Sequence, residues 1–121
     1  NCVYRDGEII GIIDFDTASP GSRLWDMAYA VYRFVPLMND QHCIEQGWQS
    51  PPDRANRLKL FVDAYGLADR SLLMDMVIRR IQTLVQFMRE NDFNLSHIPT
   101  YEQDLDYIHA NRQLFDEVIR L

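Results

Sequence analysis

The stretch that decides the fold covers residues 9–30 and reads IIGIIDFDTASPGSRLWDMAYA. Its first five residues are apolar or small and mostly β-branched, which predicts a buried strand that leads to Asp14. A Pro-Gly loop follows, and then a helix rich in Trp, Tyr and Ala that carries a second acid, Asp26. A carboxylate at the end of a buried strand is typical of sites that handle metals or phosphates. The same residue would also serve simply to end the strand or cap the next turn, so both interpretations stay open.

The residues before this stretch predict a hairpin. Residues 1–5 alternate loosely between apolar and polar types, and Asp6-Gly7 separates them from the apolar run. Asp-Gly between two apolar segments is a strong hairpin signal, because both residues tolerate positive φ. An antiparallel hairpin brings Asn1 and Asp14 to the same edge. A carboxamide and a carboxylate side by side are oxygen donors suited to Mg²⁺.

The pattern N-x-x-x…D-G…I-I-D-F-D…W-D-x-A-Y-A resembles the aminoglycoside phosphotransferase family, whose fold is similar to the catalytic lobe of protein kinases. By this resemblance Asn1 matches the Mg²⁺-binding Asn of the catalytic loop, and Asp14 matches the Mg²⁺-binding Asp of the Asp-Phe-Gly-like triplet. The triplet here is Asp14-Phe15-Asp16, without the glycine. Asp26 matches an acid at the start of a helix, which implies structural support of the site through hydrogen bonds to the catalytic loop.

The resemblance implies a phosphotransferase that moves the γ-phosphate of ATP or GTP to a hydroxyl of a small molecule, such as an aminoglycoside, with Mg²⁺ as cofactor. The catalytic Asp of the motif would lie five residues before Asn1, outside this sequence. The chain contains neither G-x-G-x-x-G nor G-x-x-x-x-G-K-[ST]. We therefore expect a carboxyl-terminal piece of a kinase-like enzyme. Alone it would be inactive, would lack the general base, and would bind Mg²⁺ and nucleotide weakly or not at all.

Composition limits the class of partner. The 121 residues are 47% hydrophobic, enough for one domain with a core, and the net charge is −6. This charge argues against nucleic acids and anionic membranes as partners and fits a cationic small substrate. No apolar run approaches the length of a membrane-spanning helix. The two cysteines, Cys2 and Cys43, are far apart in sequence, which favours reduced thiols and a cytoplasmic location.

The periodicity predicts a single α+β domain, mainly α: a hairpin in residues 1–15, then about four helices in residues 22–121. The first helix, residues 22–34, is apolar nearly all round and is expected to be buried. Residues 35–52 are expected to form a long loop, in which His42 and Trp48 either edge a substrate cleft or cross the surface with Trp48 pinned to the core. A helix capped by Ser50 is expected to end at Gly66. Longer helices are expected over residues 70–90 and from Thr100 to the end.

Acidic residues are concentrated in the last predicted helix: Glu102, Asp104, Asp106, Asp116 and Glu117. They predict a solvated helix face. The family resemblance also allows these acids to grip a cationic sugar. The three histidines have no H-x-x-H or H-E-x-x-H spacing, so a zinc site is not expected.

Two other functions compete with phosphotransfer. Asp14-Phe15-Asp16-Thr17 resembles the D-x-D motif of haloacid-dehalogenase-type phosphatases, in which one Asp is the nucleophile and the other the general acid, so Asp14 and Asp16 would share these roles. That fold requires further parallel strands, and residues 53–121 predict only helices. The other alternative is a non-catalytic kinase-like module whose exposed apolar faces lead to self-association or strand exchange.

Overall fold

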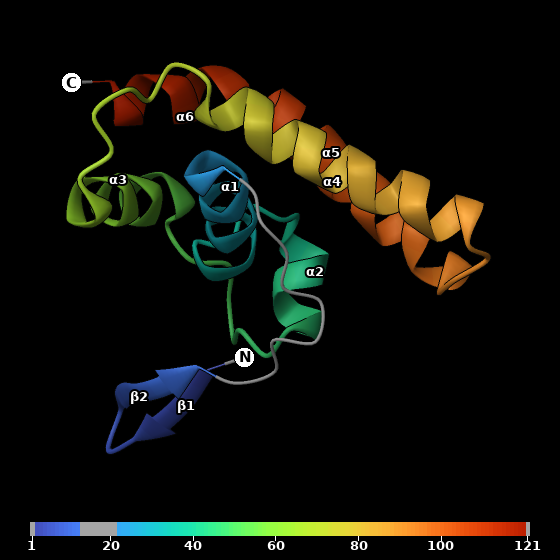
Figure 1. Cartoon of the computed structure of the whole chain (residues 1–121), viewed down its shortest axis with the longest axis horizontal. Helices are drawn as coiled ribbons and strands as arrows, with labels where there is room; N and C mark the ends of the chain where they lie inside the picture. The colour runs from blue at the N-terminus through green and yellow to red at the C-terminus, as the bar shows by residue number, and fades with distance from the viewer. Residues whose placement is uncertain (1, 13–21, 121) are drawn as a thin grey trace.

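The computed structural model describes residues 2–12 and 22–120. It consists of an N-terminal hairpin followed by helices, which confirms the predicted mainly helical α+β class (Figure 1). The strands are β1 (Cys2–Arg5) and β2 (Glu8–Ile12). The helices are α1 (Arg23–Phe34), α2 (Asp40–Glu45), α3 (Arg54–Tyr65), α4 (Leu73–Glu90), the 3₁₀ helix η1 (Leu95–His97), α5 (Ile98–Ala110) and α6 (Arg112–Ile119). The described residues therefore form six α-helices, where the sequence predicts about four.

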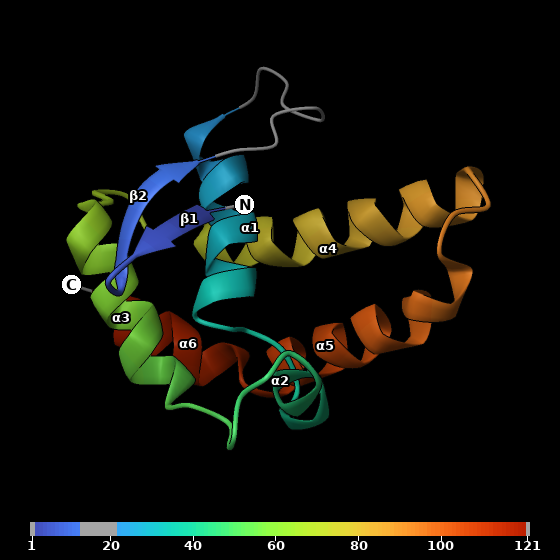
Figure 2. The ribbon, with the colours of Figure 1, turned by 90° about the horizontal axis from the view of Figure 1, so that it is seen from below.

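The hairpin forms where Asp6-Gly7 predicts it. Both turn residues have positive φ, 52° and 81°. The strands pair antiparallel with Cys2 opposite Ile12 and Arg5 opposite Glu8, and a bulge interrupts the register. In Figure 1 the hairpin lies below the helices, on the side away from α4, so in Figure 2 it is seen in front of them; β1 and α1 line a common hollow. Because Cys2 and Ile12 are opposite each other, the first residue of β1 and the last residue of β2 lie at the same end of the hairpin.

Helix α1 begins at Arg23, close to the predicted start, and Ser22 caps it: its side chain accepts a hydrogen bond from the Trp25 amide. The expectation that this helix is buried all round is wrong. Its buried residues follow one face, Met27, Ala28, Val31 and Tyr32, whereas Phe34 is 51% exposed. Trp25 and Tyr29 are partly buried and lie under the Arg80 guanidinium, whose carbon is 4.7 and 4.9 Å from their ring centres.

Residues 35–52 are not the long loop that the sequence predicts, because they contain α2. Asn39 caps this short helix by accepting a hydrogen bond from the His42 amide. The next helix, α3, is capped by Asp53, whose side chain accepts from the Asn56 amide, and not by Ser50. Gly66 ends α3 as predicted, with a left-handed φ of 77°.

Helices α4 and α5 run side by side and project from the body as an arm, joined at its tip through η1 (Figure 2). Helix α5 begins at Ile98, with Pro99 in its first turn, and not at Thr100 as the capping pattern predicts. The last predicted helix is two helices, because a break at Asn111 separates α5 from α6.

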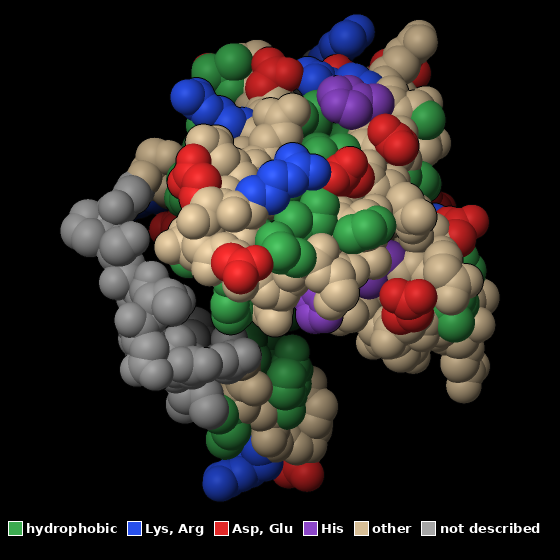
Figure 3. Space-filling model, turned by 90° about the vertical axis from the view of Figure 1, so that its right-hand side faces the viewer, with side chains coloured by type: hydrophobic (Ala, Val, Ile, Leu, Met, Phe, Trp, Pro, Cys, Tyr) green, Lys and Arg blue, Asp and Glu red, His purple; other side chains and the backbone are tan. Residues whose placement is uncertain are grey.

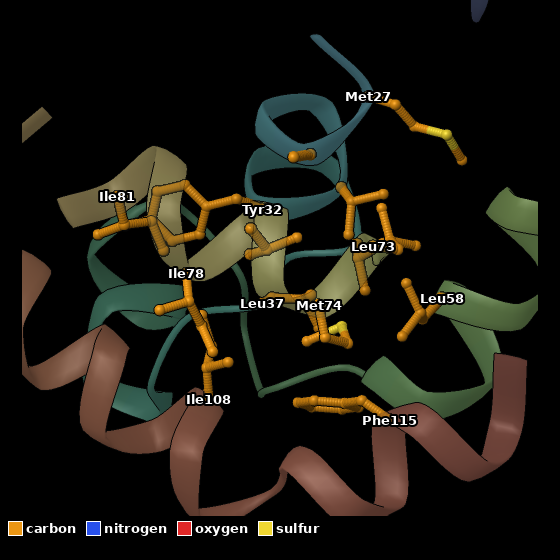
Figure 4. Packing of buried hydrophobic residues seen from close by; sticks show 14 of the residues in the cluster. Met27, Tyr32, Leu37, Leu58, Leu73, Met74, Ile78, Ile81, Ile108 and Phe115 are labelled. Carbon is orange, nitrogen blue, oxygen red and sulfur yellow. The ribbon is translucent and has the colours of Figure 1, made fainter. Parts of the chain in front are cut away.

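The core lies between α1, α3, α4, α5 and α6 (Figure 4). Its largest fully buried side chains include Tyr32, Phe115, Leu37 and Leu58. A second, smaller cluster of Val85, Met88 and Ile98 lies within the arm. The amphipathic stripes of α4 and of the α5–α6 segment supply both clusters, as their helical spacing predicts.

Candidate functional site

The two predicted metal ligands, Asn1 and Asp14, lie outside the described residues, and so does Asp16 of the phosphatase alternative. What the structure describes is the paired part of the hairpin between them. Asn1 adjoins Cys2 in the sequence, and Asp14 follows Ile12 by two residues. Cys2 and Ile12 pair with each other at the open end of the hairpin. The predicted magnesium site itself stays a prediction.

A hollow lies between β1 and α1. Its volume is about 570 Å³. Strand β1 lines it with Cys2 and Tyr4, and α1 lines it with the following residues: Asp26, Tyr29, Ala30, Arg33 and Phe34. Asp26, the predicted supporting acid, therefore lies beside the hairpin strand that begins next to Asn1.

Asp26 is exposed in the first turn of α1. Its negative charge is favourable there because the amide groups at the start of a helix carry partial positive charge. Its amide donates to the Ser22 carbonyl, and within residues 2–12 and 22–120 its carboxylate has no hydrogen-bond or ion-pair partner. At the other end of the hollow, Arg33 donates a hydrogen bond of 3.0 Å to Gln46. Asp26 is thus placed to accept hydrogen bonds from another segment, as structural support of a loop requires.

A buried polar network joins α1, α2 and α5, and the sequence analysis missed it. The Asp104 carboxylate is fully buried and accepts hydrogen bonds from Tyr32 Oη at 2.5 Å, from His42 Nδ1 at 2.6 Å and from the Asn39 amide at 2.9 Å. Burial, followed by the nearby charge of Asp104, raises the pKa of Tyr32 far above its ordinary value. The hydroxyl of Tyr32 therefore stays protonated and donates.

This network overturns two expectations. Asp104 belongs neither to a solvated face nor to a substrate grip, because its carboxylate is inside the protein. His42 is 5% exposed and does not edge a cleft. The signal that could have identified Asp104 is its position on the apolar stripe of α5, three residues after Tyr101 and four before Ile108. An acid on a buried stripe needs hydrogen-bond donors from another element.

A second polar cluster anchors α2 to α3. Arg54 Nη2 donates to the Met38 carbonyl at 2.9 Å and to Asp40 Oδ1 at 2.8 Å, and its guanidinium carbon lies 4.7 Å from the centre of the Tyr107 ring. Burial raises the pKa of the nearby Cys43 thiol, which keeps it protonated and unreactive. These contacts position α2 and supply no reactive group.

The other acids of the last two helices are at the surface. Glu102 pairs with Arg89 of α4, and Asp116 pairs with Arg112. On the face in Figure 3, acidic side chains are scattered among basic and apolar ones. No group of three or more His, Cys, Asp or Glu among the described residues is arranged to hold a metal ion. The structure therefore shows no second candidate metal centre in the part of the chain that it describes.

Three comparisons with known proteins, against family models, curated proteins and solved structures, return no match to this chain. The resemblance to aminoglycoside phosphotransferases consequently stays a prediction from the sequence pattern. None of the helices in the described ranges has the length and apolar character that crossing a membrane requires.

Proposed function

We propose that this chain forms the later part of the catalytic lobe of a phosphotransferase, which moves the γ-phosphate of ATP or GTP to a hydroxyl of a small molecule. The observation that supports this function best is the hairpin register, in which Cys2, the neighbour of Asn1 in the sequence, pairs with Ile12, which precedes Asp14 by two residues. The amide and carboxylate oxygens of Asn1 and Asp14 match the donor set that Mg²⁺ prefers. Mg²⁺, when bound, would neutralise charge on the phosphates.

The roles of this chain's own residues follow from that arrangement. Asn1 and Asp14 would hold the metal from the two ends of the hairpin. Asp26, exposed beside β1, would accept hydrogen bonds from the catalytic loop and so fix the position of Asn1. The general base would come from polypeptide outside this sequence. The net charge of −6 favours a cationic acceptor, such as an aminoglycoside, and the two free cysteines agree with a cytoplasmic enzyme.

Metal binding tests the proposal directly on this chain. Mn²⁺, which takes the same oxygen ligands as Mg²⁺, should broaden the amide NMR signals of Cys2 and Ile12 before those of the arm. Asp14→Asn and Asn1→Ala should each remove this selective broadening. Asp16→Asn is the matched control and should preserve it, because only Asp14 of the pair is a ligand in the proposed site.

Broadening that survives Asp14→Asn, or that is equally sensitive to Asp16→Asn, would contradict the phosphotransferase site. Hydrolysis of p-nitrophenyl phosphate without nucleotide would favour the phosphatase alternative instead. The described residues contain one two-stranded antiparallel sheet, which gives that alternative no support. The coding sequence immediately before Asn1 provides a separate test, since the proposal requires an Asp five residues upstream and a His two residues before that Asp.

A non-catalytic, self-associating module is the second candidate, and the hairpin surface favours it. Tyr4, Ile9 and Ile10 are 57%, 58% and 53% exposed. Exposed apolar side chains on a short sheet promote pairing with another chain. Light scattering should then show a mass that rises with concentration, and Ile9→Lys should reduce that rise. A constant monomer mass for the unmodified chain would exclude this candidate.

A further inference from the structure

The floor of the hollow is one complete face of α1. The residues that line it recur at helical spacing: Asp26, Tyr29, Ala30, Arg33 and Phe34. Ala28 and Val31 lie on the core face of α1, and Tyr29 borders both faces, because it also packs against the core cluster and lies under the Arg80 guanidinium. Asp26 and Arg33 are seven residues, or nearly two turns, apart and lie about 10 Å from each other along the helix axis. The hollow thus carries an acid at one end and a base at the other.

Both charges are available to a ligand. Asp26 is exposed, and Arg33 is half-buried with the Gln46 side-chain oxygen as its hydrogen-bond acceptor. Neither residue has a partner of opposite charge within the described ranges 2–12 and 22–120. A guanidinium has five N–H donors, so the bond to Gln46 leaves Arg33 able to bind a carboxylate.

The walls between these charges are apolar. Tyr29, Ala30 and Phe34 form the floor, and Tyr4 stands opposite on β1. Tyr4 and Phe34 are each more than half exposed, so their ring surfaces are not used by the protein's own packing. A volume of about 570 Å³ lies within the range of small-ligand sites.

The strand wall favours an extended peptide over other zwitterions. Within the described residues β1 pairs only with β2, and β1 alone supplies the strand wall of the hollow. A strand with one unpaired edge offers backbone donors and acceptors to an extended chain. A fully extended chain advances about 3.3–3.6 Å per residue, so about three residues cover the roughly 10 Å between the two charges.

We propose that the hollow between β1 and α1 binds a free, extended peptide of about three residues, with its terminal ammonium at Asp26 and its carboxylate at Arg33. An apolar central side chain would pack on Tyr29 and Ala30. This inference does not rest on the proposed phosphotransferase function, although both use Asp26. A carboxylate has two oxygens, so Asp26 can accept hydrogen bonds from a neighbouring loop and from a peptide ammonium.

Amide NMR titration of the whole chain with the tripeptide Ala-Leu-Ala tests the site. We expect saturable shifts that centre on Tyr4, Tyr29 and Ala30. Asp26→Asn and Arg33→Gln should each raise the dissociation constant about tenfold, because each loses a charge-assisted hydrogen bond. Asp106→Asn is the matched control, since Asp106 is exposed on α5 away from the hollow, and it should leave the dissociation constant unchanged.

Blocked peptides make the test independent of variant folding. Acetylation of the amino terminus should weaken binding to the unmodified chain, and binding of that peptide should be insensitive to Asp26→Asn. Amidation of the carboxyl terminus should likewise weaken binding to the unmodified chain, and binding of the amidated peptide should be insensitive to Arg33→Gln. The proposal is overturned if doubly blocked peptide binds as tightly as free peptide, or if no saturation is seen up to about 10 mM. An equal effect of Asp106→Asn and Asp26→Asn would also overturn it.

Discussion

The Asp104 carboxylate joins three helices through hydrogen bonds. We expect its loss to lower the stability of the fold strongly. Replacement by Asn keeps the shape but places an NH₂ group against donors from Tyr32 and His42. We expect Asp104→Asn to lower the free energy of unfolding by about 2–4 kcal/mol, because a buried charged acceptor is lost and its donors are left unpaired. Urea denaturation followed by circular dichroism measures this change.

Asp106 provides the control on the same helix. It is exposed, so Asp106→Asn should change the free energy of unfolding by less than about 0.5 kcal/mol. Equal midpoints for the two variants would show that the buried network does not stabilise the fold.

Tyr32 gives the molecule a dependence on alkaline pH. Burial raises its pKa in the folded state, whereas the unfolded state retains the ordinary value of 10.0. Above about pH 10 the unfolded chain therefore loses a proton that the folded chain keeps, and stability falls as pH rises; below that pH the contribution is fully present. Above about pH 10, Tyr32→Phe should make the fall of the free energy of unfolding with pH less steep, by up to about 1.4 kcal/mol per pH unit. Urea midpoints between pH 9 and 11 measure the slope.

Tyr65, which is exposed on α3, is the comparison for that slope. Tyr65→Phe should leave the alkaline slope as it is in the unmodified chain. If Tyr32→Phe and Tyr65→Phe give the same slope, the pKa of Tyr32 is not raised by its surroundings.

At the scale of elements, the end of α3 depends on backbone conformation. Gly66 has φ of 77°, and its amide donates to the Val62 and Asp63 carbonyls. An Ala Cβ would meet no atom within 4 Å, so the cost of Gly66→Ala is conformational, and we expect about 1 kcal/mol of lost stability. Thermal unfolding measures it. Gly11→Ala, which has open space and no positive φ, should lower the melting temperature less, and a larger effect at Gly11 would contradict this explanation.

Elements with local signals could be predicted from the sequence. The Asp6-Gly7 turn and the Gly66 stop each determine structure through their own backbone preferences. The start of α3 could not be predicted, because Ser50 and Asp53 are both good caps. Arg54, which follows Asp53, is buried against the Met38 carbonyl, and this contact from another segment accompanies the later start.

The candidate site was predicted only in part. The hairpin lies where the local pattern predicts it, and Asp26 lies in the first turn of α1, but its role as support of a site stays a prediction. The network around Asp104 could not be placed, because its donors come from residues more than sixty positions away in the chain. The spacing of Asp26 and Arg33 along α1 can be read from the sequence. That this helix face lines a hollow could not, because the opposite wall is formed by β1.

At the scale of the whole molecule, the hairpin and the helical body should open separately. The hairpin has two strands, and its apolar side chains Tyr4, Ile9 and Ile10 are more than half exposed. An isolated two-stranded hairpin is marginal, and local opening is easiest where few apolar side chains are buried. Amide hydrogen exchange should be faster in β1 and β2 than in the buried turns of α1 and α4. The exchange rate of the hairpin amides should be independent of urea at low urea concentration.

The control for this prediction is the core side of α1. Asp104→Asn should accelerate exchange in α1, α2 and α5 and leave the hairpin rate unchanged. A common exchange rate for hairpin and helices, shifted together by that variant, would show that the molecule opens as a single unit.

The small cluster of Val85, Met88 and Ile98 gives the arm its own internal support. Beyond the body, α4 and α5 need only each other, so adding matched helical turns to both would extend the arm without changing the main core. Arm length is therefore a dimension in which related sequences can diverge freely. Such a change would be recognised as two insertions of whole helical turns, each about three or four residues per turn, one in α4 and one in α5 at similar distances from Asn94.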